Sequence, residues 1–249
     1  MNIHEFGKEN ENIILLIHPS LVKWDYFEYI IPILEKNYHL IVPALPGYDF
    51  EEDSDFTSVE EIASEIGQWL KNNGYTHLYA VYGCSMGGSI ALMVAITQDI
   101  RIEHCVMDGG ITPYQLPWVL TRVIAFRDYA MVMMARLGGI KILEKAFSTD
   151  DYSKEDLQYV ADVLRHSSRK TIWRTFDSCN NYKVPDTIPA HLSKIHYWYA
   201  AGEEKERDWD IKYMKKNFSQ TEFKVIPNLG HGGLVLVKPK LFAEMMENL

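Results

Sequence analysis

The stretch Gly83-Cys84-Ser85-Met86-Gly87 carries the clearest chemical signal in the chain, because it matches the spacing G-x-S-x-G. This spacing predicts a sharp strand-to-helix turn that exposes the serine hydroxyl, with small residues needed two positions before and after it. The apolar residues 76–82 predict a strand before the turn, and residues 89–97 predict a helix after it. Ser85 is therefore predicted to be a nucleophile.

A serine hydroxyl is a weak nucleophile and needs a base, for which histidine is the usual choice. Of the nine histidines, His231 is the one that lies in a turn directly after a late predicted strand, between glycines that free its loop. We predict that His231 is the base. His4, His166 and His191 are interpreted as surface residues.

A carboxylate that orients the histidine completes a triad, and the chain order Ser, acid, His places it between residues 85 and 231. The predicted strand 195–200 ends just before a loop that contains Glu203 and Glu204, and Asp108 ends the preceding predicted strand. The residues alone do not decide which of these three carboxylates is the acid.

An oxyanion hole needs two backbone N–H groups aimed at one point. We expect the first from Met86, directly after the nucleophile. The second is expected from the loop that follows the first buried strand, and Ser20 or Leu21 must supply it because Pro19 has no N–H. His18 is interpreted as a structural support for this loop.

The elements that must position these residues alternate between strands and helices, which predicts an α/β fold with a mostly parallel sheet. The expected strands are 12–18, 39–43, 76–82, 102–108, 195–200 and 221–226; the expected helices are 24–36, 57–73, 89–97, 208–217 and one after Pro239. Thr57 or Ser58 is the expected N-cap of the second helix, and Gly74 its C-terminal cap.

Residues 112–190 have helical signals and no clear strand, so we predict a helical cap inserted between core segments 1–111 and 191–249. The cap contains large apolar residues that could line a pocket, although the interpretation preferred for each is that it belongs to the core of the cap. They are Trp118, Phe126, Met131, Met134 and Trp173.

At this point the chain resembles the α/β-hydrolase superfamily, and specifically its single-domain esterase-like members with a helical cap. The matching pieces span nearly the whole chain: Leu15-Leu16-Ile17-His18, Val42-Pro43-Ala44-Leu45-Pro46-Gly47, the Ser85 turn, Met107-Asp108-Gly109-Gly110, the stretch 197–203, and Leu229-Gly230-His231-Gly232. The resemblance implies a sheet of eight strands or slightly fewer. Since little chain precedes Asn12, we expect one N-terminal strand to be missing or vestigial.

The resemblance also ranks the candidate acids. Members of the superfamily usually carry the acid three residues after a glycine that ends its strand. If Ala200 takes the place of that glycine, the acid is Glu203; counting from Gly202 instead gives Lys205, which cannot serve. Glu203 is therefore preferred, with Glu204 second and Asp108 third. The chain also departs from the family pattern where His18-Pro19 replaces His-Gly and Ala44 replaces an aspartate.

Composition excludes several classes of protein. A net charge of −9 disfavours nucleic acid and anionic membranes as partners. Three cysteines make no disulfide framework and no metal site, which fits a reducing compartment. We expect a soluble cytoplasmic protein that acts on a small molecule and uses no cofactor or metal. Whether it forms a homodimer is left open.

Together these features predict a serine hydrolase that cleaves a carboxylic ester, or a related acyl bond, of a small apolar substrate through an acyl-enzyme on Ser85. A thioesterase, a C–C bond hydrolase or an acyltransferase would use the same triad, and fold does not decide among them. A non-catalytic binding protein is a further alternative, which the Ser85–His231 pair disfavours.

Overall fold

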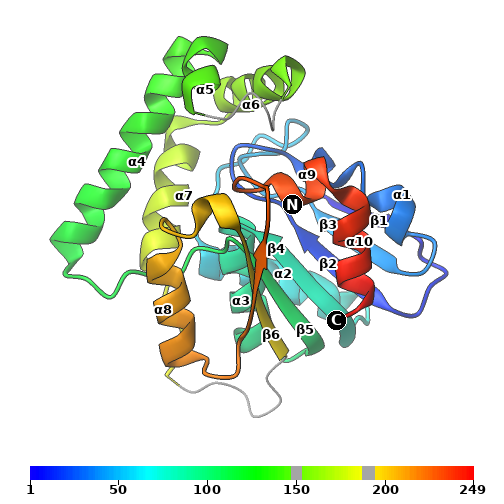
Figure 1. Cartoon of the computed structure of the whole chain (residues 1–249). Helices are drawn as coiled ribbons and strands as arrows, with labels where there is room; N and C mark the ends of the chain where they lie inside the picture. Colours follow the sequence, from blue (N-terminus) through cyan, green and yellow to red (C-terminus); the bar gives the residue numbers. More distant parts are fainter. Residues whose placement is uncertain (147–152, 187–193) are drawn as a thin grey trace.

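Seven strands form one twisted sheet through the centre of the molecule (Figure 1). The computed structural model describes residues 1–146, 153–186 and 194–249. Every neighbouring pair of strands is parallel except the first, which confirms the predicted fold class. In spatial order the strands are β1 (Ile3–Phe6), β3 (His39–Pro43), β2 (Ile13–Ile17), β4 (His77–Cys84), β5 (Arg101–Asp108), β6 (Lys194–Ala200) and β7 (Glu222–Ile226).

The sheet has seven strands, which agrees with the expectation of eight or slightly fewer, and the short strand β1 lies before Asn12, where the sequence analysis assigned none. It has four half-buried residues and pairs antiparallel with β3, with Ile3 opposite Pro43. A strand this short carries little periodic signal, since only two or three side chains alternate along it.

Alternate residues of the strands pack into two separate cores, one on each face of the sheet. In β2, Leu15 and Ile17 join one core while Ile14 and Leu16 join the other, which explains why this strand reads as a continuous apolar run. Burial of each such side chain contributes about 1.5–3 kcal/mol.

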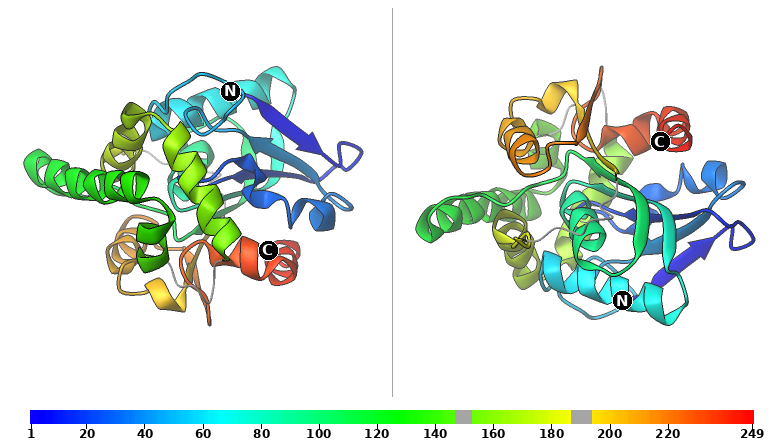
Figure 2. Two further views of the ribbon diagram at one scale, coloured as in Figure 1. Left: turned by 90° about the horizontal axis from the view of Figure 1, so that it is seen from above. Right: turned by 90° about the horizontal axis from the view of Figure 1, so that it is seen from below.

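Helices cover both faces of the sheet, as the two views of Figure 2 show. One face carries α2 (Val59–Asn72), α3 (Met86–Thr97) and α8 (Asp208–Asn217). The other carries α1 (Ile31–Leu34), α9 (Gly233–Val237) and α10 (Pro239–Glu247).

Helix boundaries follow local capping chemistry where the sequence supplies it. The α2 helix begins after Ser58, whose hydroxyl accepts a hydrogen bond from the Glu61 N–H, so of the two expected N-caps it is Ser58 that caps the helix. Gly74 follows its end with φ of +79°, the left-handed conformation expected of a C-terminal glycine.

The prediction of one helix over residues 24–36 is wrong. The chain instead makes a 3-10 turn, Trp24–Phe27, and the single-turn helix α1. Pro32 explains the break, because it has no N–H to donate to the carbonyl of Glu28 and its ring crowds that carbonyl.

Between β5 and β6 the described chain forms four helices and no strand. They are α4 (Trp118–Gly138), α5 (Ile140–Ala146), α6 (Lys154–His166) and α7 (Arg169–Asn181). In Figure 1, α5 and α6 lie above the sheet. The predicted boundary between residues 190 and 191, and His191 itself, lie outside the described residues. Within the described ranges, none of the helices combines the length and apolar character that a membrane crossing requires.

Candidate active site

Ser85 lies at the tip of a turn between β4 and α3, with φ of 53° and ψ of −118°. A non-glycine residue with positive φ is strained by about 1–3 kcal/mol, so the surroundings must hold it there. The Ser85 N–H donates to the carbonyl of Asp108 at 2.9 Å, and the Ser85 carbonyl accepts from the Gly88 N–H at 2.9 Å. The start of the helix and the end of the neighbouring strand thus fix the turn.

The glycines on either side of Ser85 are required by close backbone contacts. A Cβ atom on Gly83 would lie 2.0 Å from the carbonyl oxygen of Gly87, and one on Gly87 would lie 2.2 Å from that of Ile17. Both contacts involve backbone, which cannot move aside as a side chain can. The spacing in the sequence therefore reflects the close packing within the turn and of the turn against β2.

His231 lies in the loop between β7 and α9, and its ring is held by a carboxylate. Its Nδ1 lies 2.5 Å from Oε2 of Glu203, the third residue of the 3-10 turn Ala201–Glu203 that follows β6. The other oxygen, Oε1, accepts the Ala200 N–H at 3.0 Å. Gly109 packs against this pair: a Cβ there would lie 2.9 Å from the imidazole and 3.0 Å from Oε1.

Of the three candidate acids, the structure brings Glu203 to the histidine. Glu204 is exposed to solvent. Asp108 is buried behind the turn, where it accepts a hydrogen bond of 2.7 Å from the Tyr82 hydroxyl. The three carboxylates thus have different environments.

Burial alone would raise the pKa of both Glu203 and Asp108, but the net shifts have opposite signs because their partners differ. Burial alone would raise the pKa of Glu203, but the hydrogen bond and charge of His231, the Ala200 N–H and the Arg207 guanidinium hold it below its usual value. Burial raises the pKa of Asp108 to about 6 against the single hydrogen bond from Tyr82. Glu203 is therefore the carboxylate that favours the ionised form.

The residues expected to form an oxyanion hole lie around Ser85. Met86 is the first residue of α3, so its N–H has no acceptor within the helix. Ser20 and Leu21 line the same cavity as Ser85, and Leu21 has the left-handed φ of +69°.

His18 links two loops at this end of the sheet. Its Nε2 accepts the Leu45 N–H at 3.2 Å, so its Nδ1 carries the proton and donates to the Pro19 carbonyl at 2.8 Å. Burial lowers the pKa of His18 to about 4, which keeps the ring neutral at pH 7. These contacts agree with the interpretation of His18 as a support for the loop.

A cavity of about 420 Å³ lies over Ser85 and is lined by segments far apart in the sequence. The loop after β2 and the nucleophile turn form one part of the wall, His231 and Leu236 another, and Tyr159 and Val160 of α6 a third. The lining is mostly apolar and contains no lysine or arginine among the described residues. Its charged members are the carboxylates Asp25, Glu28, Glu155 and Asp156.

The apolar residues predicted to line a pocket, or to form the core of the cap, do neither in most cases. Trp118, Phe126, Met131 and Met134 all lie on α4 and are more than half exposed. Trp173 packs edge-on against Tyr129, with ring centroids 5.7 Å apart. The periodicity of α4 does not distinguish its inward face from its outward face, because both faces are apolar.

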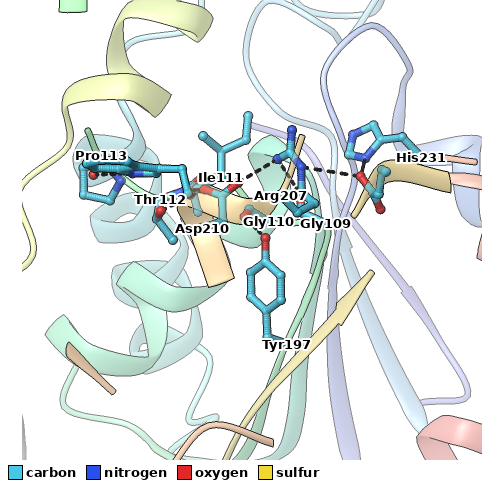
Figure 3. A network of polar contacts seen from close by, with 12 residues as sticks. Gly109, Gly110, Ile111, Thr112, Pro113, Tyr197, Arg207, Asp210 and His231 are labelled. Atoms are coloured by element: carbon cyan, nitrogen blue, oxygen red, sulfur yellow. Dashed lines mark hydrogen bonds and ion pairs between the residues drawn. The ribbon is translucent and has the colours of Figure 1, made fainter. Parts of the chain in front are cut away.

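Arg207 is a largely buried residue that the sequence prediction missed. Its guanidinium reaches Glu203 on one side and Asp210 of α8 on the other, with Nη1 3.2 Å from the Asp210 carboxylate and 3.2 Å from the Gly109 carbonyl (Figure 3). Asp210 in turn accepts both the N–H and the hydroxyl of Thr112. The network ties the loop of Glu203 to the chain leaving β5.

The i, i+3 and i, i+4 spacings among Glu203, Arg207 and Asp210 were the available signal for this network. Within the described residues, no group of three His, Cys, Asp or Glu side chains is arranged to hold a metal ion.

Comparisons with known proteins agree with this architecture. A family model described as the alpha/beta hydrolase family matches residues 14–245. An uncharacterized hydrolase of Saccharomyces cerevisiae is 28% identical over 108 residues, which are 43% of this chain and only 37% of the yeast protein.

Solved structures that match over 99% of the chain include the following two. An alpha/beta hydrolase family protein from Desulfitobacterium hafniense has a TM-score of 0.76 at 20% identity, with 99% of that chain covered. An esterase from Thermogutta terrifontis has a TM-score of 0.75 at 16% identity, with 91% of that chain covered. At such identities these structures show the shared fold alone.

Proposed function

Because the chain belongs to the alpha/beta hydrolase family, we propose that it is a serine hydrolase that cleaves a carboxylic ester of a small, uncharged and largely apolar substrate. One observation carries the proposal: Ser85 and His231 line the same cavity, and His231 is hydrogen-bonded to the buried carboxylate of Glu203. These are the three groups, in the three roles, that acyl transfer to serine requires.

The proposed reaction begins when Ser85 Oγ attacks the carbonyl carbon of the ester. With Nδ1 of His231 committed to Glu203, Nε2 takes the serine proton and passes it to the departing alkoxide, leaving an acyl group on Ser85. A water molecule then repeats the sequence and releases the acid. Glu203 stays ionised throughout and stabilises the imidazolium.

The negative charge that develops on the carbonyl oxygen needs donors already in place. We assign this role to the N–H of Met86 together with that of Ser20 or Leu21. The position of Met86 at the start of α3 supports the assignment, since the positive end of the helix dipole adds to its N–H.

The helices of segment 112–190 are proposed to act as a cap that shapes the substrate cavity. The contribution of Tyr159 and Val160 to the cavity wall supports this role. The Tyr159 hydroxyl hydrogen-bonds to Asp25 and accepts the Lys23 N–H at 2.8 Å, so α6 is also fastened to the core segment. The carboxylates of the wall disfavour an anionic substrate.

Labelling with a fluorophosphonate probe tests the proposal. The wild-type protein is expected to form one covalent adduct, located at Ser85 by mass spectrometry, and Ser85→Ala to form none. Ser89→Ala is a matched control, because Ser89 is buried in α3 and donates to the Ile111 carbonyl. A folded wild-type protein that stays unlabelled and turns over neither esters nor thioesters would refute the proposal and favour a binding protein.

A further inference from the structure

The α4 helix carries apolar side chains on two opposite faces. Thr121, Ala125 and Ala135 are buried on the inward face, which packs on α7. The opposite face carries five large apolar residues that are each between 57% and 82% exposed. We call them the outer stripe: Val119, Val123, Phe126, Met134 and Leu137.

The outer stripe is continuous and free of charge. At about 100° per residue, its members and the half-buried Ala130 fall within an arc of about 80° that is centred opposite the inward face. Arg122 and Arg127 flank the arc, and each is paired with a carboxylate, Asp177 and Asp128 respectively. A helix that is apolar on both faces normally has a partner on each.

We propose that the outer stripe is the contact through which two copies of this chain form a twofold dimer, with the α4 helices packed antiparallel. The sequence of the stripe is nearly symmetric about Asp128. Val119 and Leu137 lie nine residues on either side of it, and Phe126 and Ala130 lie two residues on either side. A twofold interface needs this self-complementarity, because each residue meets its counterpart from the other end of the patch.

The sizes of the side chains also match in the antiparallel arrangement. The large ring of Phe126 meets the small side chain of Ala130 of the second copy, as interdigitated packing requires. Asp128 lies on the opposite side of the helix and pairs with Arg127 of its own chain, so this charge pair stays outside the contact.

The available area suits a dimer. The stripe exposes on the order of 500 Å² of apolar surface, which is near the upper end for the largest patch on a monomer. A standard interface buries roughly 800 Å² per partner, a little over half of it apolar. The helix also projects away from the sheet in both views of Figure 2, so a second copy can reach the stripe.

A lipid surface is the rival occupant, but the chemistry of the patch disfavours it. Helices that lie on membranes combine an apolar face with a basic one, whereas the other face of α4 is buried and the chain carries a net charge of −9. Flotation with phosphatidylcholine vesicles distinguishes the two.

Sedimentation of the purified protein tests the dimer. We expect twice the monomer mass at micromolar concentrations for the wild type, and the monomer mass for Val123→Glu. Val225→Glu is the matched control: it makes the same substitution at an exposed residue of β7 and is expected to stay dimeric. Unchanged ester turnover by Val123→Glu would show that the variant folds. A monomeric wild type, or one that floats with the vesicles as a monomer, would overturn the proposal.

Cysteine crosslinking tests the antiparallel orientation. The double variant Val119→Cys/Leu137→Cys is expected to give a disulfide-linked dimer on a non-reducing gel, because residue 119 of one copy meets residue 137 of the other. Neither single variant should crosslink efficiently. The three native cysteines are buried and do not interfere. If each single variant crosslinks and the double variant does so no better, the helices pack parallel and the proposed arrangement is wrong.

Discussion

The Nε atom of Arg207 lies 3.6 Å from Oε2 of Glu203, and both side chains are largely buried. The same guanidinium also contacts Asp210, so one buried cation serves two buried carboxylates. An ion pair in such a place is worth little as a stabiliser but strongly affects the proton affinity of its partners. Arg207 is thus positioned to act on the proposed triad through Glu203.

Replacement of Arg207 is predicted to change the pH dependence of the reaction. Without the guanidinium the Glu203 carboxylate becomes more basic and holds the proton of the Glu203–His231 pair more tightly. In Arg207→Met we expect the acidic limb of the kcat/KM profile to move up by about half a pH unit or more, with a roughly tenfold lower kcat.

Two further variants separate this electrostatic role from a structural one. Arg207→Lys keeps the charge and should restore the limb toward its wild-type position. Lys212→Met removes an exposed cation of α8, the helix that follows Arg207, and should leave the profile unchanged. If Arg207→Met folds and the acidic limb of its profile does not move, Arg207 has no electrostatic role in the reaction.

The choice of acid is tested by two isosteric substitutions. Glu203→Gln removes the charge that orients and stabilises the histidine, and we expect kcat to fall by about 10³–10⁴. Asp108→Asn keeps the buried volume and the contact with Tyr82, so turnover of a p-nitrophenyl short-chain ester should stay within about threefold of the wild type. The reverse pattern would assign the role to Asp108.

Gly109 offers a test of packing around the histidine. In Gly109→Ala the new Cβ would press against His231 and Glu203, so we expect at least about a hundredfold loss of kcat/KM. Gly74→Ala is the control, because its positive φ imposes similar strain, about 1–2 kcal/mol, but nothing lies within 4 Å of the new atom. Both variants should therefore unfold at a lower temperature than the wild type, but only Gly109→Ala should lose activity. Equal activity in the two would argue against close packing at Gly109.

Stability is predicted to fall on acidification because of His18. Its pKa is about 4 in the folded state and about 6.5 when unfolded, so the unfolded chain binds the proton first. The contribution is fully present above pH 6.5 and is lost as pH falls from 6.5 to 4, for a total of about 3 kcal/mol. His104 and His196, whose pKa values burial also lowers, act in the same direction.

His18→Gln isolates this effect. The glutamine oxygen can accept the Leu45 N–H but does not titrate, so the free energy of unfolding should depend less steeply on pH between 6.5 and 4. Denaturant unfolding of both proteins at several pH values measures the difference, in which groups common to both cancel. Parallel curves would mean that His18 takes up no proton on unfolding.

Substrate charge is predicted to matter through the carboxylates of the cavity. The wild type should prefer a p-nitrophenyl ester with a neutral acyl chain to one that ends in a carboxylate. In Glu28→Gln/Glu155→Gln this preference should shrink about fivefold, and added salt should shrink it in the wild type as well. Glu65→Gln, at an exposed position of α2, is the control. If neither the double substitution nor added salt changes the preference, the shape of the cavity and not its charge determines it.

Much of the sheet was predictable because parallel strands buried on both faces leave continuous apolar runs, as in residues 13–17. The antiparallel strand β1 was not, since four half-buried residues carry no such run. The helix prediction for residues 24–36 failed because apolar spacing was weighed without Pro32. Periodicity describes which faces are apolar but not what covers them, which is why the outward face of α4 was misread.

The residues of the proposed triad likewise differ in how far the sequence alone could identify them. Ser85 is marked by a local constraint on backbone packing, so a five-residue pattern suffices to find it. The position of Glu203 depends on how the chain turns after β6, and the residues alone left three carboxylates open. Arg207 is distinguished by its position between Glu203 and Asp210, which its i, i+4 and i, i+3 spacings permit but do not establish.

The connection between β5 and β6 has a consequence for how this protein can change. The two strands are hydrogen-bonded neighbours, so the sheet fixes the points where segment 112–190 leaves and returns, whatever lies between them. Ser85, Glu203 and His231 all lie outside that segment, whereas Tyr159 and Val160 of the cavity wall lie inside it. Substitutions, insertions or deletions within that segment can therefore change one part of the cavity wall without altering any residue of the proposed triad.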